Sequence, residues 1–408
     1  MLNNRDNSKF KLSRRKLLKY AGAGICYLSL MGITGCGQDK DENDQVDKDV
    51  EPKKKGKSQN KIAADYKKGL INPKPSPWFE TFNNGEIKCE LCPNECKLNQ
   101  GERSLCRVRE NREGKGYTLA YGNPALLQED PIERKPFYHV LPGSRALSVS
   151  TAGCNLECKF CEVWDMALEY PEDVFAYDVA PEKVIRYARE GGLTSISFAF
   201  GEPVIFYEYM EDTALIAKEE GYLNLVHTAG YIQPKPLEKI VDKIDAVNVD
   251  LKSFEPEFYQ EIVGGELEPV LNSIKLLKDA GVHVEITNII IPTLNDNMDM
   301  IKEMCEWIVK ELDENVPLHF SRFYPLYKLS DLPRTPVSTL EEARNIAMDA
   351  GLNFVYIAKV TDHEGENTFC PECGEVVINR MGFVIEELNI QGGACSYCGF
   401  DIPGIWDN

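Results

Sequence analysis

The sequence is short of basic residues, and this shortage limits the kinds of partner that the protein can bind. Lysine and arginine total 46 against 65 aspartate and glutamate residues, which gives a formal net charge of -19 at pH 7. Nucleic-acid binding depends largely on cationic contacts with phosphates, so we expect no nucleic-acid-binding role that rests mainly on charge. A local basic groove is still compatible with this overall balance.

The N-terminal apolar segment lacks the length of a transmembrane helix. It runs from about residue 20 to residue 34, whereas a membrane-spanning helix needs about 20 apolar residues. Arg14 and Arg15 precede it, and Ile33-Thr34-Gly35-Cys36 ends it. This order resembles a twin-arginine export signal that ends in a lipobox, which implies membrane attachment through a lipid on Cys36. An unprocessed basic tail on a cytoplasmic protein is the alternative.

Aromatic residues are absent from the charged stretch that follows this segment, DKDENDQVDKDVEPKKKGKSQNK. A charged stretch without aromatics cannot bury a core, so we expect a disordered tether. The whole chain of 408 residues suits one barrel-sized domain with appendages. The predicted division is a signal over residues 1–36, a tether over 37–70, a Cys-rich N-terminal region over 71–144, a barrel over 145–360 and a zinc-ribbon-like segment over 361–408.

A fourth cysteine is missing from the loop TAGCNLECKFCEVW at residues 151–164. Its three cysteines, Cys154, Cys158 and Cys161, have the spacing Cys-x3-Cys-x2-Cys. A closed zinc site or a fully capped iron-sulfur cluster uses four ligands, so three thiolates leave one metal position open. An open position is typical of a catalytic metal, because a substrate or cofactor can bind there directly. Three ordinary buried cysteines are the alternative, which the surrounding loop residues disfavour.

Eight of the other eleven cysteines form two quartets whose spacings suit metals better than disulfides, and this usage fits folding in a reducing compartment. The first quartet could close a zinc site or hold an auxiliary iron-sulfur cluster. The second consists of two Cys-x2-Cys-Gly turns around the strand-like VVINRMGFVIEEL, a pattern typical of a zinc ribbon, with an auxiliary cluster as the rival. Cys305 is predicted to be a core residue on a helix. The quartets are Cys89, Cys92, Cys96 and Cys106, and Cys370, Cys373, Cys395 and Cys398.

Short β-branched runs alternate with helical patterns between Arg145 and Val360. Continuous apolar runs are typical of buried parallel strands, and the helices between them return the chain to the same end of the sheet. This alternation predicts an α/β fold with a partial, open (β/α)6 TIM-like barrel. The six predicted strands are residues 145–151, 195–200, 223–228, 246–252, 283–291 and 317–324.

Polar or glycine-containing groups lie at the ends of these predicted strands. Barrel enzymes place their chemistry at the carboxyl ends of the strands, so we expect the groups to converge on one rim. Each group alone is weak evidence for an active site, because Glu202 could cap a helix and His319 could be a core histidine. Besides the three-cysteine loop, the groups are Gly201-Glu202-Pro203, Thr228-Ala229-Gly230, Asp250-Leu251-Lys252, Asn288 to Pro292, and His319 with Ser321 and Arg322.

With these residues the sequence resembles the radical S-adenosylmethionine (SAM) superfamily over about residues 145–360. The hallmark of that superfamily is Cys-x3-Cys-x2-Cys with an aromatic residue before the last cysteine, here Phe160. The resemblance implies that the three thiolates hold a [4Fe-4S] cluster and that the amino and carboxylate groups of SAM bind its fourth iron. It further implies an enzyme that cleaves SAM reductively and abstracts hydrogen from a substrate that the sequence does not identify.

The resemblance also assigns SAM contacts. Gly201-Glu202-Pro203 matches the Gly-Gly-Glu segment that receives the SAM amino group, with Phe200 in place of the first glycine. The segments that begin at Thr228 and Asp250 are similar to the Thr-Asn-Gly and Asp-Leu-Lys segments of glycyl-radical-activating enzymes, with His227 where those enzymes have an aspartate. No catalytic residue is assigned beyond the cluster and the SAM site. The implied cofactor-binding residues are Phe160, Gly201, Glu202, Pro203, Thr228, Asp250, Lys252, Asn288 and His319.

A closer similarity, over about residues 87–406, is to the radical SAM enzymes of the AmmeMemoRadiSam type. It is carried by IIIPTLND, HFSRFYP, CELCP and CSYCGFDIPGIW. It implies a low-potential electron donor such as flavodoxin or ferredoxin. The alternative function is a glycyl-radical-activating enzyme whose substrate is a partner protein. A non-catalytic electron carrier is a third hypothesis, which the open three-ligand loop and the SAM segments disfavour.

Overall fold

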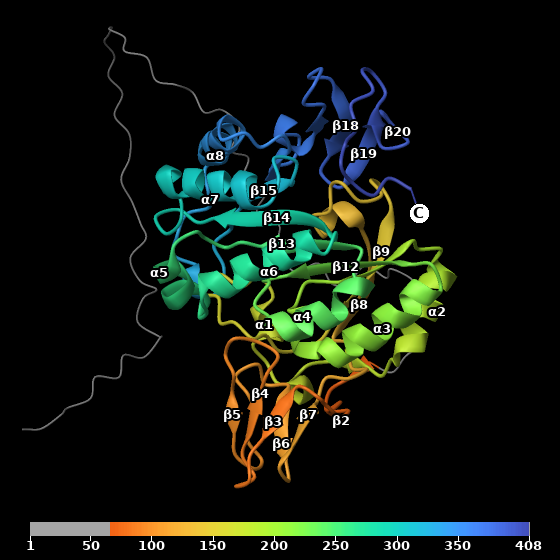
Figure 1. Cartoon of the computed structure of the whole chain (residues 1–408), viewed down its shortest axis with the longest axis vertical. Coiled ribbons are helices and arrows are strands. Elements are labelled where there is room, and N and C mark those ends of the chain that lie inside the picture. The colour runs from red at the N-terminus through yellow and green to blue at the C-terminus, as the bar shows by residue number, and fades with distance from the viewer. Residues whose placement is uncertain (1–65, 408) are drawn as a thin grey trace, which may run out of the picture. The chain divides into compact units, whose positions relative to one another are not determined.

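The computed structural model describes residues 66–407 (Figure 1). The predicted signal over residues 1–36 and most of the predicted tether over 37–70 lie outside these residues. The end of the tether was placed too late, because Tyr66–Lys67 forms strand β1 and pairs antiparallel with β10 (Ala176–Tyr177). The Tyr66 ring lies 5.4 Å from the Phe175 ring and 4.5 Å from the Tyr177 ring. The first aromatic residue after the charged stretch therefore packs against two other aromatic rings.

An eight-stranded sheet forms the centre of the described part, in the order β16-β15-β14-β13-β12-β11-β9-β8. Its strands from β9 to β16 run parallel, and β8 pairs antiparallel with β9. All six predicted strands are present, so the predicted α/β barrel-type fold is confirmed. The strands are β8 (Leu126–Pro131), β9 (Arg145–Ser150), β11 (Ser195–Phe198), β12 (Leu223–Thr228), β13 (Ala246–Asp250), β14 (His283–Ile290), β15 (Leu318–Arg322) and β16 (Val355–Ala358).

The structure adds two strands that the sequence pattern did not indicate. Strand β8 has the sequence LLQEDP, in which polar residues interrupt the apolar run, and β16 is only four residues long. Both lie at the ends of the strand order and each has one neighbour in the sheet. An edge position requires less continuous apolar sequence than a central one, which explains why both were missed.

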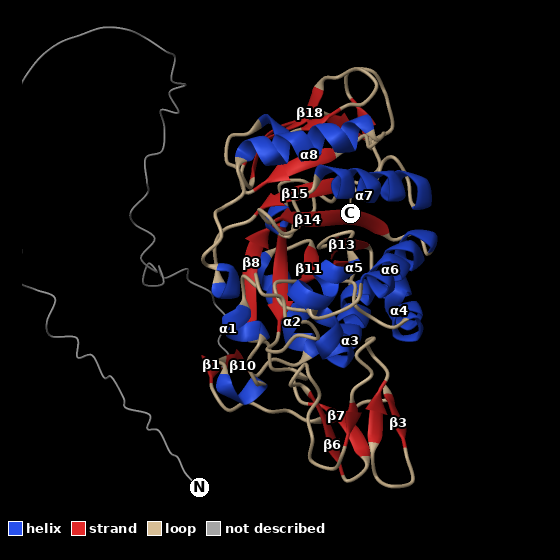
Figure 2. Ribbon diagram, turned by 90° about the vertical axis from the view of Figure 1, so that its left-hand side faces the viewer, coloured by secondary structure: helices blue, strands red, loops and turns tan. Residues whose placement is uncertain are grey.

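Helices follow the strands and pack on the sheet (Figure 2). In α6 the buried residues include Val270, Ile274 and Leu277, at the spacing of one helix face. Cys305 is completely buried in α7, as predicted. Within residues 66–407, no helix combines the length and apolarity that crossing a membrane requires. The main helices are α2 (Pro181–Gly191), α3 (Tyr207–Glu219), α4 (Pro234–Ile240), α6 (Leu267–Asp279), α7 (Met298–Glu311) and α8 (Val337–Asp349).

Small antiparallel sheets precede and follow the barrel. The N-terminal region holds the sheets β2-β7-β6 and β3-β4-β5, and the C-terminal segment holds β17-β18-β19 and β20-β21. The latter segment packs on Tyr138, Phe354 and Tyr356 of the barrel. Their bounds are β2 (Lys74–Pro75), β3 (Phe79–Thr81), β4 (Ile87–Cys89), β5 (Lys97–Leu98), β6 (Arg109–Arg112), β7 (Lys115–Thr118), β17 (Thr368–Phe369), β18 (Val376–Met381), β19 (Val384–Leu388), β20 (Ile390–Gln391) and β21 (Ala394–Cys395).

Candidate active site

The three-cysteine loop follows β9 and is held by backbone contacts from a distant segment. The amides of Glu157 and Lys159 donate to the carbonyl oxygens of Val263 and Ile262, each at 2.9 Å. These acceptors belong to a π-helical turn, Tyr259–Val263. At Gly153 the backbone has φ of 99°, and a Cβ there would lie 2.5 Å from the Cys106 carbonyl oxygen. Only glycine fits this close approach, which brings the loop against the N-terminal region.

The thiols of Cys154, Cys158 and Cys161 are free and partly buried. Burial raises the pKa of the Cys158 thiol to about 11, although the nearby Lys252 ammonium opposes this shift. Such a thiol keeps its proton at neutral pH and loses it when a metal binds. The three sulfurs of this loop do not all lie within 4.8 Å of one another, as the ligands of a single metal ion would. A wider spacing suits a cubane, in which each thiolate binds a different iron.

Glu202 is a buried carboxylate with neutral hydrogen-bond donors. Its Oε1 accepts from the Val204 amide at 3.1 Å and from the Thr228 hydroxyl at 2.6 Å, and its Oε2 accepts from the Ala229 amide at 2.9 Å. Burial raises the pKa of Glu202, while these three hydrogen bonds act in the opposite direction. A ligand ammonium placed at this carboxylate would supply the positive charge that its hydrogen-bond donors lack.

Asp250 and Lys252 form an ion pair at the end of β13. Lys252 Nζ lies 3.0 Å from Asp250 Oδ2, and His227 Nε2 lies 2.9 Å from Asp250 Oδ1. Burial opposes ionisation of Asp250, but Lys252 and His227 hold its pKa well below the ordinary value. Lys252 Nζ also lies 5.6 Å from the centre of the Phe160 ring. The pair therefore stays charged at neutral pH and lies beside the three-cysteine loop.

Several other predicted residues support these groups through the backbone. Gly201 N donates to Ser150 Oγ at 3.0 Å, and Pro203 begins the short helical turn that Glu202 caps. Asn288 Nδ2 donates to the Leu251 carbonyl oxygen at 2.7 Å. Phe200, which stands where the resemblance expects glycine, has φ of 73°. This left-handed conformation is the one that glycine adopts without strain, so the substitution keeps the turn at an energetic cost.

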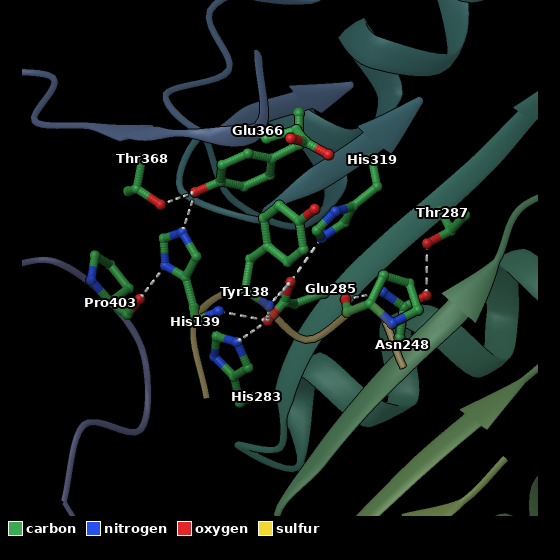
Figure 3. Close-up of polar contacts among 12 residues, drawn as sticks. Tyr138, His139, Asn248, His283, Glu285, Thr287, His319, Glu366, Thr368 and Pro403 are labelled. Atoms are coloured by element: carbon green, nitrogen blue, oxygen red, sulfur yellow. Dashed lines mark hydrogen bonds and ion pairs between the residues drawn. The ribbon is translucent and has the colours of Figure 1, made fainter. Parts of the chain in front are cut away.

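His319 does not join this group. It is completely buried in β15, and its Nε2 lies 2.7 Å from Glu285 Oε2 (Figure 3). The same carboxylate accepts from the amides of Tyr138 and His139 and contacts His283 Nε2 at 3.2 Å. Burial disfavours the Glu285 charge, yet hydrogen bonds from the two histidines hold its pKa well below the ordinary value. Glu285 and His319 lie near the starts of β14 and β15, so His319 has a partner away from the rim.

Comparisons with known proteins identify the family to which the chain belongs. Residues 148–308 match the family model for the radical SAM superfamily. The chain is 40% identical over 324 residues to the uncharacterized protein MJ0808 of Methanocaldococcus jannaschii, covering 79% of this chain and 96% of that protein. The chain belongs to the radical SAM superfamily.

Two further similarities accompany this radical SAM membership. The pyruvate formate-lyase-activating enzyme of Clostridium pasteurianum is 29% identical over 209 residues, which cover 47% of this chain and 84% of that enzyme. A solved structure of a radical SAM methyltransferase from Sphaerobacter thermophilus has a TM-score of 0.44 and 16% identity, and it covers 75% of this chain and 81% of that chain.

The radical SAM site contains residues that the sequence reasoning did not single out. Asn295 is 1% exposed, and its Nδ2 donates to the carbonyl oxygens of Lys252 and Ile289 at 2.7 and 2.8 Å. The Tyr259 hydroxyl accepts from the Lys252 amide at 3.1 Å. Both hold the backbone of the segment that carries Lys252. Asn295 lies within the motif IIIPTLND, so the motif was an available signal, whereas nothing local marks Tyr259.

The C-terminal quartet of this radical SAM protein has the geometry of a site for one ion. Cys370 Sγ lies 3.6 Å from Cys398 Sγ, and Cys373 Sγ lies 3.8 Å from Cys395 Sγ. All four sulfurs lie within 4.8 Å of one another. Zinc–sulfur bonds of about 2.3 Å in a tetrahedron separate the sulfurs by about 3.8 Å. The quartet therefore fits a tetrahedral ion and is too compact for a cubane.

Proposed function

We propose that this radical SAM enzyme holds a [4Fe-4S] cluster on Cys154, Cys158 and Cys161, cleaves SAM reductively and abstracts hydrogen from a substrate still to be identified. The observation that carries the proposal is the meeting of the three free thiols with the buried Glu202 carboxylate and the Asp250–Lys252 pair on one rim. When bound, the reduced cluster supplies the electron that splits the SAM sulfonium into methionine and a 5'-deoxyadenosyl radical.

The residues of this chain have distinct tasks in that reaction. Three thiolates leave one cluster position for SAM. Glu202, fixed by three hydrogen bonds, accepts from the SAM ammonium, and its orientation is set before SAM binds. Lys252, held by Asp250 and 11% exposed, offers a cation to the SAM carboxylate or ribose. The buried walls around these groups exclude water from a reactive radical.

The direct test is anaerobic incubation of the reconstituted full chain with SAM and dithionite, followed by quantification of 5'-deoxyadenosine. Formation of 5'-deoxyadenosine in step with methionine supports the proposal. A protein that carries a [4Fe-4S] cluster but forms no 5'-deoxyadenosine would contradict it. Flavodoxin or ferredoxin in place of dithionite tests the proposed class of electron donor.

Glu202→Gln is expected to weaken SAM binding by about 5- to 30-fold, because a charge-assisted hydrogen bond to an ammonium becomes a neutral one worth about 1 to 2 kcal/mol less. Calorimetric titration of the anaerobic protein with SAM measures the change, and the iron-sulfur absorbance should stay the same. Glu366→Gln is the matched control, since Glu366 is also buried and accepts from a backbone amide, that of Gly382. Equal SAM affinity in Glu202→Gln and the parent protein would assign the ammonium to another group.

A glycyl-radical-activating enzyme is the second candidate function. The similarity to a pyruvate formate-lyase-activating enzyme favours it. An open groove of about 550 Å³ also favours it, and Tyr231, Gln260 and Gly264 are among its lining residues. A Cβ on Gly264 would lie 3.4 Å from Cβ of Glu157, which belongs to the three-cysteine loop. The test incubates the enzyme, SAM and reductant with a glycyl-radical enzyme from the same organism. A glycyl doublet in the electron paramagnetic resonance (EPR) spectrum selects this function, and SAM cleavage without a protein radical selects the first.

We also propose membrane attachment through the N-terminal signal, which rests on the sequence pattern alone. Replacement of Arg14 and Arg15 by lysine should keep the chain in the cytoplasm, and Cys36→Ser should prevent lipidation. Cell fractionation with mass spectrometry of the N-terminus measures both outcomes. A soluble parent protein that retains Met1 to Gly35 would contradict membrane attachment and support the cytoplasmic alternative.

A further inference from the structure

The N-terminal quartet surrounds a cavity against the barrel. Cys89, Cys92 and Cys96 lie within one eight-residue stretch and Cys106 follows ten residues later, and all four line this one cavity. All four thiols are free. Cys89 and Cys106 are 5% and 7% exposed. Four converging thiols without disulfides are a ligand set for a soft metal centre.

The spacing of these sulfurs distinguishes a site for a cluster from a site for a single ion. In the C-terminal quartet the four sulfurs lie within 4.8 Å of one another, and within residues 66–407 no other cysteine group meets that criterion. Cys89, Cys92, Cys96 and Cys106 thus surround a space instead of converging on a point. A cubane needs such a space, because each thiolate binds a different corner iron.

One buried donor at the cavity lacks a partner, and it suits a centre made of thiolate and sulfide. Arg109 is 1% exposed, lines the cavity and pairs with Glu208 at 2.6 Å through Nη1. Its Nε has no hydrogen-bond partner, although a buried donor without an acceptor is costly. The Ser104 hydroxyl lies 3.0 Å from Cys106 Sγ. A sulfur acceptor in the cavity would satisfy this Nε–H, while the Glu208 carboxylate already balances the charge of the guanidinium.

The cavity shares a wall with the proposed SAM-binding cluster. Asn155, which follows Cys154, lines the cavity, and Asn94 Nδ2 donates to its carbonyl oxygen at 2.7 Å. A Cβ on Gly153 would meet the Cys106 carbonyl oxygen at 2.5 Å, so the two cysteine segments are in backbone contact. Two metal centres at these places would be near neighbours.

We propose that Cys89, Cys92, Cys96 and Cys106 bind a second, redox-active [4Fe-4S] cluster. Each iron has a protein thiolate, so this cluster has no open position and exchanges single electrons without binding substrate. Dithionite or a low-potential one-electron protein donor reduces it by one electron. The proposal concerns metal binding by this quartet and stands whether or not the neighbouring site cleaves SAM.

The test uses the full chain with Cys154, Cys158 and Cys161 all replaced by alanine, reconstituted anaerobically with iron and sulfide. This variant should retain about four irons per chain and give a reduced [4Fe-4S] EPR signal with dithionite. Adding Cys92→Ala and Cys96→Ala together leaves only two thiolates and should remove that signal and most of the remaining iron. Adding Cys305→Ala instead should leave both unchanged, because Cys305 is buried in α7 and lines neither site.

The outcomes separate the alternatives. Zinc in the N-terminal quartet, or no iron in the folded triple variant, overturns the proposal. Iron that persists after the joint replacement of Cys92 and Cys96 is non-specific and also overturns it. Circular dichroism monitors folding. If the joint replacement of Cys92 and Cys96 unfolds the chain, iron, sulfide and EPR of the triple variant decide between a cluster and none.

Discussion

Replacing Cys154, Cys158 or Cys161 by alanine is expected to abolish 5'-deoxyadenosine formation by the reconstituted protein. Two thiolates do not hold a cubane that must also keep one position for SAM. The loss should exceed the about 100-fold effect that is typical of disturbing residues around a metal site. Iron should fall by about four per chain if the cluster of this loop is lost as a unit.

The matched control for this prediction is Cys305→Ala. It also removes a buried thiol, but Cys305 lies on α7 and packs in the core. It should lower stability because it creates a small cavity, and it should leave iron content and SAM cleavage per folded molecule unchanged. Activity that survives the loss of any loop cysteine would refute the assignment of the SAM-binding cluster. Anaerobic product analysis and iron quantification on the same samples measure both quantities.

Cys395→Ala is expected to remove one zinc ion per chain and to unfold the C-terminal segment before the barrel. Cys395 is 3% exposed and packs with Cys370, Val377 and Ile378 in the small core of that segment. A structural ion supplies much of the folding energy of such a segment, so the local loss should reach at least about 4 kcal/mol. Limited proteolysis followed by mass spectrometry should show early cleavage within residues 368–407.

Ser396→Ala is the control for this experiment, because Ser396 neighbours the ligand, is exposed and supplies no sulfur. Zinc content and protease resistance should match the parent protein. SAM cleavage per folded molecule should survive Cys395→Ala, since the quartet lies apart from the rim residues. In protein purified without reconstitution, loss of about four irons with sulfide on Cys395→Ala, in place of one metal ion, would contradict the single-ion site that the sulfur distances indicate.

The sequence by itself determined the barrel and most of the rim. Central strands are continuous apolar runs, and the rim groups lie at or just after their ends. Local pattern was therefore enough to place Thr228 and Asp250 at the last positions of observed strands and Glu202 shortly after one. The spacing of Cys154, Cys158 and Cys161 is likewise a local property. These features could be predicted because neighbours in sequence remain neighbours in the loops and strand ends.

Only the tertiary structure decided the features that depend on which strands and loops meet. His319 lies on the strand that the sequence predicts, β15. Its contact with Glu285 depends on the pairing of β14 with β15 and on the loop of Tyr138, whose amide donates to the same carboxylate. The edge strands β8 and β16 are too polar or too short to be recognised without their neighbours.

The two cysteine quartets show the same limit most clearly. Both have spacings that are compatible with zinc or a cluster, because sequence spacing does not determine the distance between sulfurs on separate turns. Folding places Cys370 Sγ 3.6 Å from Cys398 Sγ. The cysteines of the N-terminal quartet instead line a cavity beside the buried Arg109. Metal choice depends on these distances and charges, which long-range packing sets and no local pattern contains.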